Sequence, residues 1–168
     1  TCEHGTRRVT KTDQNNVISS ITDNYDNKKL NSPNDICVHS NGTIFFTDPP
    51  YGIINSERIE GIPGKMMYGG CYVFKYDPKK KNLEAFVKDM DCPNGIALSP
   101  NETQLFISNT GNTKYIRRYD IDKNLKISKP VVFVKAEQNY VFDGFRFDAD
   151  KNLWTSCGNG VGCYNQLG

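Results

Sequence analysis

The sequence has 168 residues, a length typical of one domain, and a formal net charge of +2. Its 21 Lys and Arg residues are interspersed with 19 Asp and Glu residues, so the composition gives no basic surface for nucleic acid or for a membrane. No apolar stretch approaches the roughly 20 residues of a transmembrane helix. We therefore expect no nucleic-acid or membrane partner, and no obligate protein partner.

The first part of the chain, residues 1–30, begins with TCEHG and continues into a run from Arg7 to Asp13. A polar turn and a second apolar run, Val17 to Ile21, follow. No segment of the chain shows a convincing helical period, and short alternating runs of this kind predict β-strands. An all-β fold is therefore expected.

The next stretch, Asn31 to Gly52, contains a hairpin signal: two short apolar runs split by Asn41-Gly42. An Asn-Gly pair at this place predicts a type I′ turn, in which both central residues have positive φ. The side chains of Asn34 and Asp48 lie just before the first run and just after the second. Because a hairpin returns to its starting end, both side chains are expected at the same end.

This arrangement recurs along the chain. Asn94 and Asp143 occupy the position of Asn34 in two further hairpins, spaced 60 and 49 residues apart. Each unit adds two more apolar runs, giving four short strands, and such repeated units are the blades of a β-propeller. The expected units are a partial blade at 1–30, blades at 31–90 and 91–138, and a partial blade at 139–168. These cannot close a ring, so we expect a fragment of a larger propeller.

Connectivity predicts where the polar side chains of these units meet. In a four-stranded meander, the start of the innermost strand and the connection between the second and third strands lie on one face. Asn34, Asn94 and Asp143 should therefore converge at the mouth of the central channel, and Glu3, His4 and Asp48 should ring it. The long connection from Pro49 to Gly69 is expected to act as a lid over this mouth.

The six cysteines do not suggest a disulfide framework, because no C-x-x-C spacing occurs and most lie in strand-like runs. Buried free thiols that behave as small apolar side chains are favoured over pairing. The glycosylation sequons at Asn41 and Asn101 would matter only in a secreted protein. The sequence does not establish localisation; a cytoplasmic location is favoured, and secretion stays open.

Three motifs in order carry a family resemblance: NSPND…GxIxFTDPPYG, PNGxAxSP and DGxxxDxxxNLW, preceded by CEHGTRRV. Together they resemble the gluconolactonase/senescence-marker-protein (regucalcin-like) family of six-bladed β-propeller lactonases. The resemblance covers essentially the whole chain. It implies a divalent metal, most commonly calcium, at the bottom of the central pocket.

The resemblance also assigns roles to residues. Asn94 and Asp143 match metal ligands of the family, and Asn34 matches a residue that binds metal in some members and substrate in others. Asp143 further matches the carboxylate assigned as general base or nucleophile. One family ligand, a glutamate of the first blade, does not lie within these 168 residues, so the fragment alone is expected to be inactive. Phe142 replaces the usual proline beside Asp143.

The expected function is calcium-dependent hydrolysis of a sugar lactone such as gluconolactone to the free acid, with Asp143 as the catalytic residue. Asn34, Asp48, Glu3 and His4 are expected to contact the substrate, although a turn-forming Asp48 and a solvated Glu3-His4 pair are open alternatives. Two other functions also stay open. One is a calcium-binding propeller scaffold without turnover, and the other is an organophosphate or aryl-ester hydrolase acting at the same site.

Overall fold

The structure, a computed structural model, describes residues 1–54, 61–137, 140–158 and 160–168. These residues form β-strands and no helix, so they include no helix that could span a membrane. The all-β prediction is confirmed. The strands are β1 (Cys2–Glu3), β2 (Arg8–Thr12), β3 (Ile18–Thr22), β4 (Asn24–Tyr25), β5 (Lys28–Lys29), β6 (Ile36–Val38), β7 (Ile44–Asp48), β8 (Cys71–Asp77), β9 (Asn82–Met90), β10 (Pro93–Leu98), β11 (Gln104–Asn109), β12 (Tyr115–Asp120), β13 (Val131–Lys135), β14 (Phe142–Phe147), β15 (Leu153–Cys157) and β16 (Gly160–Tyr164).

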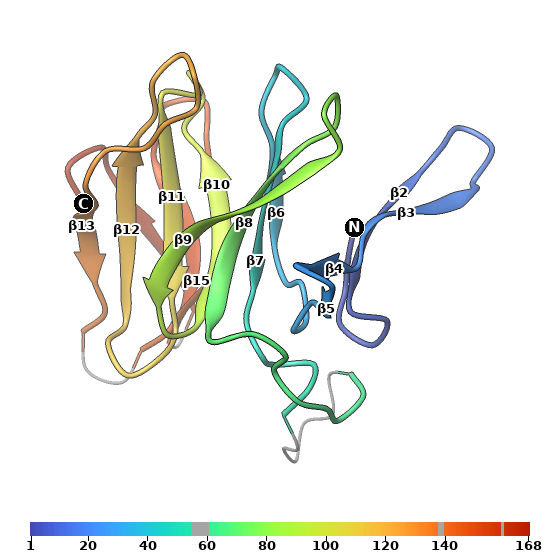
Figure 1. Ribbon diagram of the computed structural model, residues 1–168. Helices are drawn as coiled ribbons and strands as arrows, with labels where there is room; N and C mark the ends of the chain where they lie inside the picture. The colour runs from blue at the N-terminus through green and yellow to red at the C-terminus, as the bar shows by residue number, and fades with distance from the viewer. Residues whose placement is uncertain (55–60, 138–139, 159) are drawn as a thin grey trace.

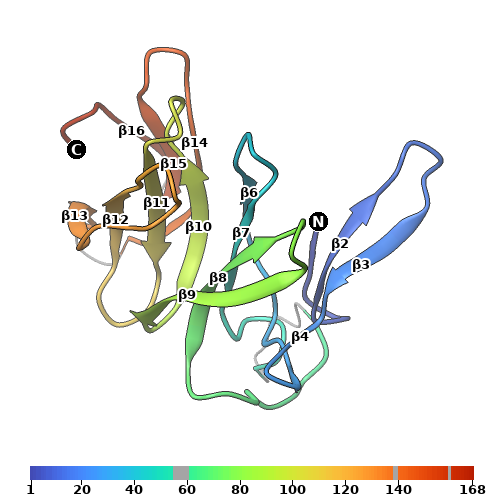
Figure 2. The ribbon, with the colours of Figure 1, turned by 45° about the horizontal axis from the view of Figure 1, so that its top comes forward.

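Strands pair with their neighbours in chain order to form antiparallel meanders. The sheets are β1-β2-β3, β6-β7-β8-β9, β10-β11-β12-β13 and β14-β15-β16, with a separate β4-β5 hairpin that the sequence did not predict. Figure 1 shows the β6–β9 sheet between the β2-β3 hairpin and the β10–β13 sheet, and Figure 2 shows β14–β16 beyond β10–β13. The sheets fall inside the four expected units, whose boundaries stay a prediction.

The core explains why the sheets stack. Phe45 and Phe46 are adjacent in β7 and both are fully buried, yet they belong to different clusters. Phe45 packs with Ile96 and Leu105 of the next sheet, whereas Phe46 packs with Val9 of the preceding one. Because successive strand residues point to opposite faces, the β6–β9 sheet is buried on both sides. Sheets covered on both faces by neighbouring sheets are the packing of propeller blades.

The hairpin turn at Asn41-Gly42 differs from the predicted type I′ turn. Gly42 has a φ of 93°, but Asn41 is not among the described residues with positive φ. The Gly42 N–H donates to the His39 carbonyl at 2.8 Å, and His39 N–H donates to the Thr43 carbonyl at 2.9 Å. The loop therefore has one residue more than a two-residue hairpin, and only its last position needs the left-handed conformation.

The cysteines are all free among the described residues, as predicted. Their burial is less uniform than predicted: Cys71 is buried, but Cys163 is exposed. The expectation of a buried, apolar role is wrong for Cys163, which lies in β16, the last strand of its sheet, where no residue is fully buried.

Candidate functional site

A cavity of about 200 Å³ lies where the inner strands β6, β10 and β14 begin. It brings together the three residues that sequence reasoning expected to converge, Asn34, Asn94 and Asp143. Tyr51, Thr110 and Val141 complete its lining. A larger cavity of about 520 Å³ shares Asn34 and Asp143 and continues along β14 toward Arg146 and Trp154. The volume of the larger cavity is typical of sites that bind a small organic ligand.

Close packing of β10 on β14 holds Asn94 and Asp143 in place. The backbone at Gly95 approaches so closely that a Cβ there would lie 2.2 Å from the Asp143 carbonyl oxygen. The Ser108 hydroxyl accepts from Gly95 N–H at 2.7 Å and donates to the same Asp143 carbonyl at 3.1 Å. Only glycine allows this approach, so the Asn94-Gly95 pair positions Asn94 beside the backbone of Asp143.

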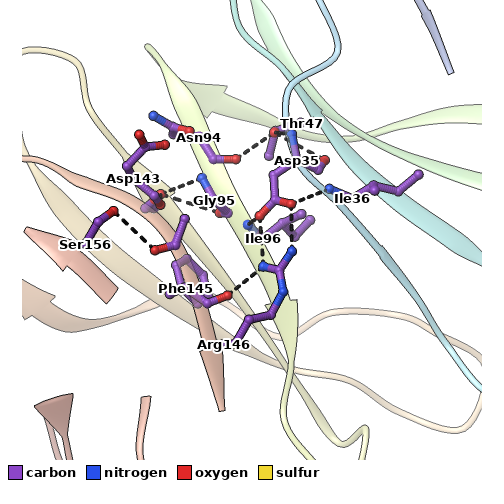
Figure 3. Close-up of polar contacts among 12 residues, drawn as sticks. Asp35, Ile36, Thr47, Asn94, Gly95, Ile96, Asp143, Phe145, Arg146 and Ser156 are labelled. Carbon is purple, nitrogen blue, oxygen red and sulfur yellow. Dashed lines mark hydrogen bonds and ion pairs between the residues drawn. The ribbon is translucent and has the colours of Figure 1, made fainter. Parts of the chain in front are cut away.

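Asp35 links the three inner strands just beyond the cavity, as Figure 3 shows. Its carboxylate accepts from Ile36 N–H at 2.8 Å and from Ile96 N–H at 3.0 Å. Arg146 donates to both carboxylate oxygens, at 3.0 and 3.1 Å. The arginine side chain is 64% exposed, so water screens the charge attraction and the two backbone contacts carry more weight. Sequence reasoning missed Asp35, although it directly follows Asn34.

Thr47 makes a second link between two of the site residues. Its hydroxyl donates to the Asn94 carbonyl at 2.6 Å, and its own carbonyl accepts from Asn34 N–H at 2.9 Å. Thr47 is fully buried, so these contacts are shielded from water. The backbones of Asn34 and Asn94 are thereby held at a fixed spacing.

The side chain of Asn94 tests whether the site suits a metal. Asn94 is only 7% exposed, and its Oδ1 atom has no hydrogen-bond partner among the described residues. A buried amide oxygen without a hydrogen-bond partner destabilises the folded state by about 1–3 kcal/mol unless a ligand or ion binds it. Calcium takes amide and carboxylate oxygens as ligands. The unpartnered oxygen therefore fits a calcium ion in the cavity.

The other two candidate ligands are consistent with such an ion. Asn34 Nδ2 lies 3.4 Å from His4 Nε2. An amide nitrogen can only donate, so this contact turns Nδ2 toward His4 and Oδ1 away from it. Asp143 adds an exposed carboxylate that lines both cavities. No group of three or more His, Cys, Asp or Glu side chains that could hold a metal ion occurs anywhere in the described residues, so the candidate site depends on amide oxygens.

Glu3 and Asp48 are not among the residues lining either cavity. The Glu3 carboxylate accepts from Arg8 at 2.7 Å and from Thr10 at 2.9 Å. Hydrogen bonds from Arg8 and Thr6 lower the pKa of Glu3 to about 2. The Glu3 carboxylate is therefore hydrogen-bonded to side chains of its own sheet. A direct substrate contact for Glu3 stays a prediction, one that this placement does not support.

Asp48 lies in the protein interior. It is fully buried and accepts hydrogen bonds from Asn31 N–H, at 2.8 Å, and from the Tyr68 hydroxyl. Burial raises the pKa of Asp48 to about 7, against the opposing effects of backbone hydrogen bonds and the charge of Arg7. Of the four substrate-contact predictions, the structure thus places Asn34 at the cavity, His4 in contact with Asn34, and Glu3 and Asp48 elsewhere.

Tyr51 and Thr110 are lining residues that sequence reasoning did not assign. Their hydroxyls are hydrogen-bonded to each other, joining the loop after β7 to the loop after β11. Burial raises the pKa of Tyr51 above its ordinary range, so the phenol stays neutral. Of the expected lid, Arg58 lies outside the described residues. The described part contributes Tyr51 to the cavity wall.

A family model described as the SMP-30/gluconolactonase/LRE-like region matches residues 1–166. The chain belongs to this family. A gluconolactonase from Zymomonas mobilis is 33% identical over 168 residues, covering 95% of this chain and 46% of the relative. The chain thus spans about half the length of that gluconolactonase.

Solved structures show the same fold. A gluconolactonase from Xanthomonas campestris superposes with a TM-score of 0.90 at 32% identity, covering 99% of this chain and 55% of the other. A calcium-binding protein, regucalcin, from Agrobacterium tumefaciens gives a TM-score of 0.68 at 18% identity, covering 98% of this chain and 55% of the other. The SMP-30/gluconolactonase-like chain is therefore part of a β-propeller, as predicted. The count of six blades stays a prediction.

Proposed function

We propose that the full-length protein is a calcium-dependent hydrolase that opens a sugar lactone, such as gluconolactone, to the free acid. The observation that carries the proposal is the buried, unpartnered Oδ1 of Asn94 in a cavity shared with Asn34 and Asp143. Membership of the family and similarity to the Zymomonas mobilis gluconolactonase support the choice of reaction.

Asn34, Asn94 and Asp143 would hold the calcium ion, together with a ligand from outside this chain. When bound, calcium would polarise the lactone carbonyl and favour the negative charge that develops on its oxygen. Two neutral amides and one carboxylate offset little of the ion's charge, so its polarising effect would stay strong.

Asp143 has the role of general base in this proposal. Its carboxylate is exposed to both cavities and can take a proton from a water molecule that attacks the lactone carbonyl. Asn34 and Asn94 carry no titratable group, so they orient and bind but do not move protons. Tyr51 and Thr110, hydrogen-bonded to each other, also line the cavity.

Two variants of the full-length protein test these roles. Asp143→Asn should lose roughly 10²–10⁴-fold in lactone hydrolysis through loss of the base, and further through weaker calcium binding. Asn94→Ala should act through calcium affinity, so added calcium should restore much of its activity. Rates of lactone hydrolysis measured against calcium concentration for both variants distinguish the loss of a general base from the loss of a calcium ligand.

The outcome distinguishes the proposal from its alternatives. If saturating calcium returns Asp143→Asn to wild-type turnover, Asp143 is only a ligand. If the wild type binds calcium but opens no lactone, the scaffold alternative holds. Turnover of aryl esters or organophosphates without lactone hydrolysis would favour the third function.

A further inference from the structure

The loop after β7 and the loop after β11 meet through one pair of hydroxyl groups at the candidate cavity. Tyr51 belongs to the first loop and Thr110 to the second, and their side-chain hydroxyls are hydrogen-bonded to each other. Both residues line the cavity of about 200 Å³, together with Asn34, Asn94 and Asp143. We propose that the Tyr51-Thr110 pair determines substrate specificity by accepting a hydrogen bond from a hydroxyl group of the ligand, a role that rests on the proposed lactone hydrolysis.

The direction of the hydrogen bonds determines what the pair offers to a ligand. The Thr110 hydroxyl donates to the Cys92 carbonyl at 3.4 Å. A hydroxyl group has one proton to donate and lone pairs with which to accept, so the Thr110 oxygen accepts from the Tyr51 hydroxyl. Burial raises the pKa of Tyr51, so the phenol keeps its proton at neutral pH. Both protons are therefore used within the pair, and the two oxygens have only lone pairs left for a ligand.

Contacts with the connection between β9 and β10 hold Thr110 in place. The Thr110 N–H donates to the Cys92 carbonyl at 2.9 Å. The Asp91 carboxylate accepts from Asn112 N–H at 2.7 Å and from the Asn109 side-chain amide. Because Asp91 and Cys92 are consecutive, one short stretch of chain holds the loop before, at and after Thr110.

Ser32 holds the loop that carries Tyr51. Its hydroxyl donates to the Pro49 carbonyl at 2.6 Å and accepts from Gly52 N–H at 2.9 Å, so it contacts the chain on both sides of Tyr51. Ser32 is fully buried, so water does not compete for these two hydrogen bonds. The hydroxyl pair is thus positioned before a ligand arrives. Groups that are already ordered lose little conformational freedom on binding, which favours affinity.

A preformed pair of acceptors selects a ligand that supplies a hydrogen-bond donor. The ring carbons of a sugar lactone carry O–H groups, whereas an unsubstituted lactone of the same ring size has none. An acceptor that the ligand covers but leaves unpaired weakens binding, because its contact with water is lost. Sites built to hydrogen-bond a substrate hydroxyl therefore discriminate against analogues that lack it. The Tyr51-Thr110 pair should thus favour hydroxylated lactones over unsubstituted ones.

The first experiment compares two lactones of the same ring size, gluconolactone and δ-valerolactone, of which only gluconolactone carries hydroxyl groups. It uses the full-length protein with saturating calcium and measures the ratio of the two kcat/KM values. Tyr51→Phe should reduce the ratio, gluconolactone over δ-valerolactone, by about 3–10-fold, the effect of losing one hydrogen bond between neutral groups. Thr110→Val should reduce it by a similar factor. Thr110→Ser keeps the hydroxyl and should retain the wild-type ratio.

The second experiment measures hydroxyl recognition without turnover. Anhydroglucitol, the six-membered cyclic ether of glucitol, carries ring hydroxyls but no lactone carbonyl, so it cannot be hydrolysed. Calorimetric titration should show that it binds the wild type, and that it binds Tyr51→Phe about 3–10-fold more weakly. Tyr119→Phe is the matched control, because it also loses one phenolic hydroxyl but Tyr119 lies in the core and outside the cavity lining. Tyr119→Phe should bind anhydroglucitol as the wild type does.

Two results would overturn the proposal. One is an equal loss of kcat/KM for both lactones in Tyr51→Phe, because a purely structural role of the hydroxyl would affect both substrates alike. The other is an affinity for anhydroglucitol that is the same in Tyr51→Phe and in the wild type, including no binding by either. The proposed function is refuted by a different result, a wild type that opens neither lactone. Hydroxyl recognition would still stand in that case if anhydroglucitol binding depends on the Tyr51 hydroxyl.

Discussion

Replacing Gly95 with alanine should disrupt the site without removing any polar group. The added Cβ would lie 2.2 Å from the Asp143 carbonyl oxygen and 2.9 Å from the Phe145 ring. The first of these atoms belongs to the backbone of β14, so the clash is relieved only by moving β14 away from β10. Overpacking of this kind costs about 1–3 kcal/mol, and the backbone contact places Gly95→Ala at the upper end of that range.

The same movement should separate Asn94 from Asp143. We therefore expect Gly95→Ala to lower calcium affinity in the full-length protein by about 10-fold or more, which corresponds to about 1.4 kcal/mol. Urea unfolding measures the loss of stability, and calorimetric titration measures calcium binding.

Gly144→Ala is the matched control. Gly144 directly follows Asp143 and is also a strand residue, but a Cβ there would meet nothing within 4 Å. The free energy of unfolding of Gly144→Ala should stay near that of the wild type. If Gly95→Ala and Gly144→Ala show the same stability and the same calcium affinity, the close approach of β10 and β14 does not control the site.

Three further predictions concern carboxylates. Asp35→Ala should lower the free energy of unfolding in urea by about 2–6 kcal/mol, because it leaves two backbone N–H groups without their acceptor, at about 1–3 kcal/mol each. Wild-type stability would contradict the linking role. The pKa of Asp48 is raised in the folded state from 3.8 to about 7, so its contribution to stability is greatest below pH 3.8 and is lost as the pH rises to about 7. Asp48→Asn should remove that decline in stability with pH. An Asp48→Asn variant whose stability depends on pH as the wild type does would contradict the raised pKa of Asp48. The pKa of Glu3 is lowered from 4.5 to about 2, so its contribution is present above pH 4.5 and is lost as the pH falls to about 2. Glu3→Gln should flatten unfolding profiles in that range, and a wild-type profile would show that the contacts with Arg8 and Thr10 do not stabilise the fold.

The repeat spacing was enough to predict that Asn34, Asn94 and Asp143 would share one cavity. Meander connectivity determines which face each strand start occupies, and these three residues lie at equivalent strand starts. Connectivity does not determine the direction of a side chain at the end of a strand. For that reason Glu3 and Asp48 were expected at the cavity, whereas hydrogen bonds hold Glu3 in its own sheet and Asp48 in the interior.

Asp35 shows what a single sequence cannot give. Its partners Ile96 and Arg146 are 61 and 111 residues away in the chain, and no local pattern pairs them.

The hairpin turns show a second limit of prediction from a single sequence. Gly42, Leu125 and Lys151 all have positive φ and close turns of the same kind, but they share no residue type. The length of the loop, rather than the residue at its end, imposes that conformation.

The most direct test of the account is a crystal structure of the full-length protein grown with calcium. The account predicts an ion within about 2.3–2.6 Å of Asn94 Oδ1, with Asn34 and Asp143 oxygens in the same coordination shell. Calcium bound elsewhere, or an Asn94 side chain that contacts protein atoms alone while calcium saturates the crystal, would contradict it.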